Sequence, residues 1–200
     1  MNEIKQNWEE RYITGNLPWD SGRQDSSLEE LIANKTISAC KTLELGCGTG
    51  SNAIWLATKG FEVTATDISS EAISIARDKA TKANETVNFM VMDILQESLP
   101  EEKYDFVFDR GCFHSFDGEE RDTFAKSVYT CLKPAGIWLS LIGSADSPPC
   151  EMGPPRLTAQ EIASRIEPFF KIKLLKTTHF DSDQPDPPPA WACLMQKRSI

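Results

Sequence analysis

Residues 43–50 read LELGCGTG, and this stretch decides the fold that the chain is expected to adopt. A short apolar run ends there in three alternate glycines, Gly46, Gly48 and Gly50. Glycine is favoured where the backbone must take a positive φ or where a ligand approaches it closely. The pattern predicts a buried strand over 41–46, a tight ligand-binding loop, and a helix beginning near residue 51 whose first amides are free to donate hydrogen bonds.

Two kinds of ligand could bind such a loop, a dinucleotide or S-adenosylmethionine, and the spacing distinguishes them. A dinucleotide site has the pattern G-x-G-x-x-G, but Ser51 occupies the sixth position here and the third glycine comes one residue early. Glu44 lies inside the strand, where its carboxylate would repel a pyrophosphate and attract the sulfonium and amino groups of S-adenosylmethionine. The pattern E-x-G-x-G-x-G therefore favours S-adenosylmethionine over a nicotinamide cofactor.

Carboxylates also follow the next two predicted strands. Residues 61–67 are rich in strand-forming residues and end at Asp67, 19 residues after Gly48, while 87–92 is followed by Asp93. An acid at the end of the second strand can accept hydrogen bonds from both hydroxyls of an adenosine ribose. A single acid of this kind is more often a helix cap or a loop residue. Three strand ends that each deliver an acid or a glycine to one sheet edge indicate a ligand site.

Strand and helix patterns alternate along the whole chain, which predicts a doubly wound α/β fold. Strands are expected at 41–46, 61–67, 87–92, 104–109, 137–142, 169–178 and 190–197. Helices are expected near the N-terminus and at 28–34, 51–59, 69–83, 117–132 and 158–168, the second of these opening with the capping box Ser27-x-x-Glu30. Residues 133–136 have the composition of a turn, and 144–155 and 181–189 that of proline-rich loops.

Composition and charge narrow the function classes. The 200 residues carry 21 Lys and Arg against 30 Asp and Glu, so the net charge is −9. An anionic surface without a basic cluster disfavours nucleic-acid and acidic-membrane partners. Six cysteines without a C-x-x-C pair, and two histidines, support neither a metal site nor a disulfide framework. With no signal-like or membrane-spanning segment in the sequence, we expect a cytoplasmic protein that acts on a small-molecule substrate.

Two further segments complete the pattern. Residues 17–22 read LPWDSG, and residues 109–116, after the fourth strand, read DRGCFHSF. Together with ELGCGTG and PAWACLMQKR at 189–198, they resemble class I S-adenosylmethionine-dependent methyltransferases, in particular the branch of thiopurine, thiol and halide methyltransferases. The resemblance implies a seven-stranded, mostly parallel sheet with helices on both faces and an antiparallel last strand. It also implies a single domain over 1–200, with a helical lid at 1–36 and a core at 37–200.

The resemblance extends to individual residues. It implies that Trp19 contacts the cofactor from the lid and that Asp93 faces the adenine edge. The full set of residues expected to contact S-adenosylmethionine is Trp19, Glu44, Gly46, Cys47, Gly48, Gly50, Asp67, Ile68, Asp93, Ile94 and Asp109.

Arg110 and His114 are the candidate catalytic residues. Arg110 could pair with Asp109 or Glu44, which is the favoured interpretation, or it could orient an anionic substrate. Histidine normally titrates near neutral pH, so His114 is a candidate general base, or else a buried histidine that begins a helix.

The acceptor class follows from the scarcity of bases. Transfer to an anion such as a thiolate neutralises charge, so a dry apolar pocket and good alignment suffice. The apolar wall of this pocket is expected to be formed by Trp19, Phe113, Phe116 and the loop around Met152. An amine or hydroxyl acceptor would need a base, and the only other candidates are Asp109 and Tyr12.

We therefore predict a soft or anionic small-molecule acceptor. The alternatives are an amine or hydroxyl acceptor, on a small molecule or a protein, and a non-catalytic module that binds S-adenosylmethionine.

Overall fold

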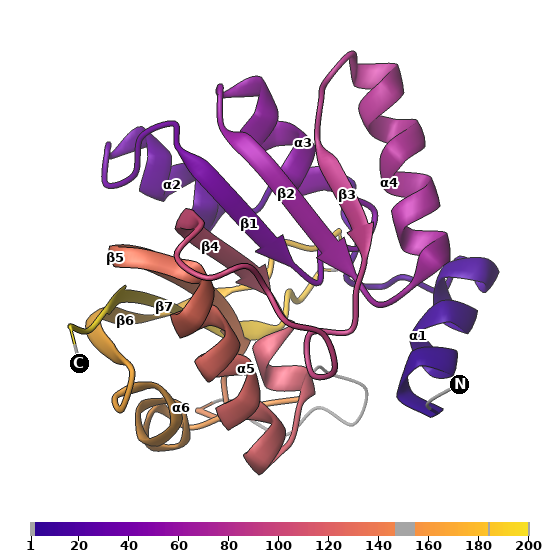
Figure 1. The fold of residues 1–200 in the computed structure, drawn as a ribbon. Coiled ribbons are helices and arrows are strands. Elements are labelled where there is room, and N and C mark those ends of the chain that lie inside the picture. Colours follow the sequence, from indigo (N-terminus) through magenta and orange to yellow (C-terminus); the bar gives the residue numbers. More distant parts are fainter. Residues whose placement is uncertain (1–2, 147–154, 184, 200) are drawn as a thin grey trace.

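Figure 1 shows the computed structural model, which describes residues 3–146, 155–183 and 185–199. Seven strands form one sheet in the order β3-β2-β1-β4-β5-β7-β6. The strands are β1 (Lys41–Leu45), β2 (Glu62–Asp67), β3 (Asn88–Val91), β4 (Tyr104–Arg110), β5 (Leu132–Gly143), β6 (Phe170–His179) and β7 (Pro189–Lys197). The pairs among β1 to β5 are parallel, whereas β7 runs antiparallel to both of its neighbours. The predicted mixed sheet with an antiparallel last strand is confirmed.

Helices cover both faces of the sheet (Figure 1). They are α1 (Glu3–Thr14), α2 (Ser26–Ala33), α3 (Ser51–Thr58), α4 (Ser70–Ala83), the short 3₁₀ turn η1 (Phe113–Ser115), α5 (Gly118–Cys131) and α6 (Ala159–Ile166). On one face, buried residues of α2, α3 and α4 such as Leu28, Leu56 and Ile73 pack together. On the other face, α5 and α6 contribute Phe124 and Ile162 to a second cluster. Within the described ranges, no helix has both the length and the apolar character needed to cross a membrane.

Local sequence explains most of these boundaries. Helix α4 begins where the Ser69 side chain accepts a hydrogen bond from the Ala72 amide, and it ends at Asn84 in the left-handed conformation. Helix α5 begins with a capping box that Asp117 and Glu120 form. The helix starts expected near residues 69 and 117 are confirmed, because each cap depends only on residues within one helical turn.

Two local predictions were wrong. Helix α2 is capped by Asp25, whose carboxylate accepts from the Ser27 amide, and not by Ser27 itself. The turn expected at 133–136 lies inside β5, whose register with β4 shifts between Tyr104 and Phe106. Residues 133–136 therefore bulge from the strand, and Ala135 takes a φ of 62° there.

The strand order creates the crevice in which ligands of this architecture bind. The chain leaves β1 toward β2 and β3 on one side, and continues from β4 toward β5 on the other. Strands β1 and β4 are therefore adjacent at the switch point, and ligands bind beyond the carboxyl ends of the strands there. Helix α1 lies at the same edge, beside the beginning of α4 (Figure 1).

Candidate active site

The glycine loop connects β1 to α3 at this edge. Gly46 and Gly48 have φ values of 65° and 53°, which disfavour residues with a side chain. A Cβ on Gly46 would lie 2.9 Å from both Cβ and Sγ of Cys112, just beyond β4. A Cβ on Gly48 would lie 2.9 Å from the Tyr12 hydroxyl oxygen of α1. The loop is therefore closely covered on one side by the end of β4 and on the other by the N-terminal helix.

Asp67 lies directly against this loop. One carboxylate oxygen accepts a hydrogen bond of 2.8 Å from the Gly48 amide, and the other accepts one of 3.0 Å from the Ser69 amide. Burial raises the pKa of Asp67, while these backbone hydrogen bonds act in the opposite direction. Each carboxylate oxygen retains a second acceptor site, so Asp67 can still accept from a ligand hydroxyl.

Glu44 carries the clearest unsatisfied group in the site. The residue is 1% exposed, and its Oε1 accepts a hydrogen bond of 3.3 Å from the Asn52 side-chain amide. Its Oε2 is buried and has no hydrogen-bond partner among the described residues. Burial raises the pKa of Glu44 to about 8. A buried carboxyl oxygen without a donor is costly, so this oxygen suits a ligand that brings a cation or a donor.

The remaining predicted cofactor residues of the first three strands lie at the same edge. Cys47 is buried beside the glycines, and Ile68 is half-buried directly after Asp67. After β3, Asp93 uses one carboxylate oxygen to accept a 3.0 Å hydrogen bond from the Leu95 amide, and Ile94 is buried in the core. The contacts of these residues with a cofactor remain predictions.

Asp109 is engaged within the protein. It is fully buried, and it accepts hydrogen bonds of 3.0 Å from the Phe113 amide and 2.8 Å from Trp138 Nε1. Burial raises the pKa of Asp109 to about 6. Its carboxylate therefore positions η1 against β5, and its predicted contact with the cofactor would use a remaining lone pair.

Arg110 makes different contacts from those predicted. Its Nε donates to Asp25 Oδ2 at 2.8 Å, and its terminal nitrogens donate to the carbonyl oxygens of Trp19 at 3.1 Å and Asp181 at 2.6 Å. The predicted pairing with Asp109 or Glu44 was wrong. Successive side chains of a strand point to opposite faces, so Arg110 points away from its neighbour Asp109. Arg110 instead joins the N-terminal segment to the loop between β6 and β7.

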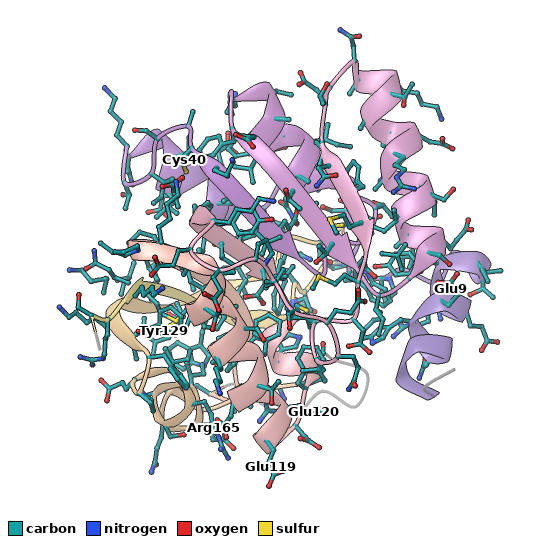
Figure 2. All side chains as sticks on the ribbon, viewed as in Figure 1. Glu9, Cys40, Glu119, Glu120, Tyr129 and Arg165 are labelled. Carbon is teal, nitrogen blue, oxygen red and sulfur yellow. The ribbon has the colours of Figure 1, made fainter. Side chains whose placement is uncertain are left out.

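The N-terminal segment covers the glycine loop through further contacts. The Trp19 ring packs edge-on against Trp8 and Tyr12, with centroid distances of 5.4 and 6.1 Å. Asp20 accepts a 2.6 Å hydrogen bond from the Thr49 hydroxyl. Figure 2 labels Glu9 where α1 meets the start of α4, and there its carboxylate accepts from Ser70 Oγ at 2.5 Å and from the Glu71 amide at 3.2 Å.

Three residues that join this segment to the core were not identified from the sequence: Asp20, Asp25 and Asn52. Asn52 accepts a 2.8 Å hydrogen bond from the Asp25 amide and donates one to Glu44. Because Asp25 also binds Arg110, a series of hydrogen bonds connects Arg110 to Glu44. The only sequence signal for Asn52 is a polar residue on the first, buried turn of α3.

His114 does not have the properties of a general base. It is 4% exposed, and its Nδ1 accepts a 2.6 Å hydrogen bond from the Gly143 amide. The neutral ring must then carry its hydrogen on Nε2. Burial, followed by the positive charges of Arg121 and Arg110, lowers the pKa of His114 to about 3. The nitrogen that would take a proton is occupied, and the other nitrogen is a donor.

The predicted apolar wall is also only partly supported. Phe113 is fully buried and packs edge-on against Phe124 and Trp138, so its place is in the core rather than in a pocket. Phe116 is half-buried and packs against Phe124. Met152 and most of the proline-rich segment 144–155 lie outside the described residues.

Comparison with known protein families adds to this geometry. A family model described as a methyltransferase domain matches residues 42–136, which include β1 except its first residue, β2 to β4 and the glycine loop. The chain is similar to a probable thiol methyltransferase 2 of Arabidopsis thaliana, with 29% identity over 154 residues, 72% of this chain and 66% of that protein. The aligned region thus spans just under two thirds of the plant protein.

Two further similarities are informative. An uncharacterized methyltransferase of Schizosaccharomyces pombe, C750.03c, is 34% identical over 98 residues, 48% of this chain and 68% of that protein. Among solved structures, a protein studied for the conversion of a disulfide bond into a thioacetal group during echinomycin biosynthesis superposes with a TM-score of 0.81 and 25% identity. That match covers 90% of this chain and 85% of the other.

Proposed function

We propose that this chain, which belongs to the class I S-adenosylmethionine-dependent methyltransferases, transfers a methyl group to a small sulfur nucleophile such as a thiol. S-adenosylmethionine supplies a methyl group on positively charged sulfur, which a nucleophile displaces to leave S-adenosylhomocysteine. The residues of the chain have three tasks: to hold the donor, to admit an acceptor in line with the methyl group, and to exclude water.

The residues at the carboxyl edge of the sheet fit this donor. The buried Oε2 of Glu44 has no partner in the described part of the chain, which suits a cationic group of the ligand. Asp67 lies within hydrogen-bond distance of the Gly48 amide and retains free acceptor sites for ribose hydroxyls. We further propose that residues 1–36 act as a lid, because Trp19 and Tyr12 pack together over the glycine loop.

The glycine loop provides a direct test of donor binding. Gly46→Ala is expected to weaken S-adenosylmethionine binding by at least about tenfold, because the new Cβ would lie 2.9 Å from Cys112 and force the loop to shift. Isothermal titration calorimetry measures this change. Gly15→Ala is the matched control, since Gly15 has a φ of 71° but no atom within 4 Å of the added Cβ. Equal affinity in the Gly46 and Gly15 variants would contradict the assignment of this loop.

The hydrogen bonding of His114 is the main observation that supports a thiol as the methyl acceptor. Its acceptor nitrogen is bound by the Gly143 amide, so it does not take a proton from an incoming nucleophile. The other candidate bases are no better. Both Asp109 oxygens accept internal hydrogen bonds, and burial raises the pKa of Tyr12 above its ordinary value. An acceptor that ionises by itself is therefore favoured, and a thiol, with a pKa of about 8.5, forms a reactive anion near neutral pH.

The named relatives agree with this choice of acceptor. The plant protein to which this chain is similar is a probable thiol methyltransferase, and the match includes most of the present chain. The structural neighbour with 25% identity was studied for the conversion of a disulfide bond into a thioacetal group, which is chemistry at sulfur. An amine or hydroxyl acceptor has less support, because it would need a general base, and His114, Asp109 and Tyr12 are poorly suited to that role.

The pH dependence of turnover tests the absence of a base. For a series of small thiols with different pKa values, kcat/KM is expected to rise with pH and to level off at the pKa of each thiol. Methylated products would be detected by mass spectrometry.

A midpoint that stays at one pH for every thiol would show that an enzyme group removes the proton. Methylation of an amine or alcohol without any thiol turnover would exclude the acceptor class. Donor binding without any product would favour the non-catalytic alternative.

A further inference from the structure

Asn52 fixes the roles of the two oxygens of the Glu44 carboxyl group. Its side-chain oxygen accepts a 2.8 Å hydrogen bond from the Asp25 backbone amide, which can only donate. The side-chain nitrogen of Asn52 is therefore the end that faces Glu44, and it donates to Oε1 at 3.3 Å. If Oε1 carried a proton, two hydrogens would face each other, so Oε1 remains the acceptor whether Glu44 is charged or neutral. When Glu44 holds a proton, that proton lies on Oε2.

The surroundings of Glu44 favour the neutral acid in the ligand-free protein. The residue is 1% exposed, and its Oε2 is buried without a partner in the described part of the chain. A carboxylate that leaves water without a counter-ion takes up a proton instead of staying charged. Burial accordingly raises the pKa of Glu44 to about 8, although the hydrogen bond from Asn52 acts in the opposite direction. Near neutral pH, Oε2 therefore carries a hydrogen that has no acceptor among the described residues.

The charged and titratable groups around Glu44 do not supply the missing counter-ion. Strand β1 lies between β2 and β4, which end at Asp67 and Arg110. After burial, the like charge of Asp67 raises the pKa of Glu44, and the positive charge of Arg110 lowers it by less. The Arg110 guanidinium is already bound to the Asp25 carboxylate at 2.8 Å. In the glycine loop, burial holds the pKa of the Cys47 thiol well above its ordinary value, so this neighbour is uncharged.

We propose that Asn52 is a positioning residue for the methyl donor: it keeps Oε1 of Glu44 as an acceptor, so that the hydrogen on Oε2 is exchanged for a cationic group of S-adenosylmethionine on binding. The inference rests on the methyl-donor site of the proposed function and is independent of the methyl acceptor. In the exchange the O–H bond of Oε2 breaks, its electron pair stays on the carboxylate, and the proton passes to the solvent. The bound state then buries a pair of opposite charges instead of an uncompensated one.

Proton release on binding tests the exchange. S-adenosylmethionine is titrated into the full chain by calorimetry in two buffers of different ionisation enthalpy, between about pH 6 and about pH 7, where an α-amino group with a pKa of about 7.7 stays protonated. The wild-type protein should release about one proton per bound ligand, and its affinity should rise about tenfold per pH unit. Glu44→Gln should release none. Equal release by both proteins would assign the proton to another group, and no release by wild type would show that Glu44 is already an anion. Either result overturns the proposal.

Infrared spectroscopy reports the protonation of Glu44 without a ligand. With isotope-labelled glutamate, the ligand-free protein should show the carbonyl band of a protonated glutamic acid near neutral pH, and Glu44→Gln should lack it. Absence of the band overturns the proposal even if S-adenosylmethionine binds. Proton release from Glu44 without methylation of any thiol would support the exchange and remove the proposed acceptor. Thiol methylation without proton release would leave the proposed function standing and remove the exchange.

Two variants separate the positioning role of Asn52 from a structural one. Asn52→Asp keeps the shape and the acceptor for the Asp25 amide, but it offers Oε1 no hydrogen and adds a like charge, whereas Asn52→Ala only removes the contacts. The pH at which half of the Glu44 band is lost should rise in both variants, by about one unit or more in Asn52→Asp and by less in Asn52→Ala.

Asn88→Asp is the matched control for Asn52→Asp, because Asn88 is exposed on the edge strand β3 and its substitution should leave the midpoint of the Glu44 band unchanged. Affinity for S-adenosylmethionine near neutral pH should fall by at least about tenfold in Asn52→Asp and stay at the wild-type level in Asn88→Asp. A larger shift in Asn52→Ala than in Asn52→Asp would indicate a structural role. That order, or equal shifts in Asn52→Asp and Asn88→Asp, would overturn the proposal.

Discussion

Glu44→Gln is expected to make the ligand-free protein more stable while it severely weakens S-adenosylmethionine binding. Burial raises the pKa of Glu44 to about 8 from its ordinary value of 4.5. A carboxyl with a raised pKa contributes stability that is fully present below its unfolded pKa and is lost as the pH rises toward its folded pKa. Glutamine keeps the shape and the acceptor for Asn52, but it never has to be buried as an anion.

The size of this effect depends on pH. Each pKa unit corresponds to about 1.4 kcal/mol, so the stability advantage of Glu44→Gln should increase by about 3 kcal/mol or more between about pH 5 and pH 8. Urea unfolding at several pH values measures it. Glu62→Gln is the control, because Glu62 forms an exposed ion pair with Lys41, with its side chain 73% exposed, and should show little pH-dependent difference.

Calorimetry with S-adenosylmethionine completes the test of Glu44. The neutral amide offers no charge to a cationic ligand, so affinity should fall by about 2 kcal/mol or more. A variant that loses stability at high pH relative to wild type would show that the Glu44 carboxylate has a partner in solution. A variant that keeps full affinity would remove Glu44 from the donor site.

Arg110→Gln is expected to destabilise the protein by about 3–5 kcal/mol, because it leaves the charge of Asp25 buried and uncompensated. The Asp25 side chain is 0% exposed and the Arg110 side chain 13% exposed. Denaturant unfolding measures the loss. Arg23→Gln is a matched control in the same segment: its ion pair with Asp183 has side chains 65% and 73% exposed, so the change should stay within about 1 kcal/mol.

The double variant Arg110→Met with Asp25→Asn distinguishes stability from closure of the segment. Removing both charges should restore much of the lost stability, since no buried ion remains. It should still release residues 1–36, because the contacts of Arg110 with the Trp19 and Asp181 carbonyl oxygens are lost. Limited proteolysis is expected to cut this segment faster in the double variant than in wild type. Equal cutting rates would show that Arg110 does not hold the segment closed, and would remove this support for a lid.

Features that depend on close neighbours in the chain could be predicted from the residues alone. The alternate glycines predicted the tight loop, since a positive φ at Gly46 and Gly48 is a local requirement. The caps at Ser69 and Asp117 were predictable for the same reason. The ends of β1, β2 and β3 came to one edge because parallel strands place their carboxyl ends together, so the positions of Glu44, Asp67 and Asp93 followed from the strand order.

The partners and the protonation of these groups, in contrast, depend on contacts that form when the chain folds. Arg110 is next to Asp109 in sequence, yet it pairs with Asp25, 85 residues away. His114 has its tautomer set by Gly143, 29 residues away. Glu44 is recognisable as the motif acid, but the absence of a partner for its buried oxygen within the described residues depends on the packing around it. Hydrogen bonds and burial act over a few ångströms in space, and spacing along the chain does not report such distances once the chain has folded back on itself.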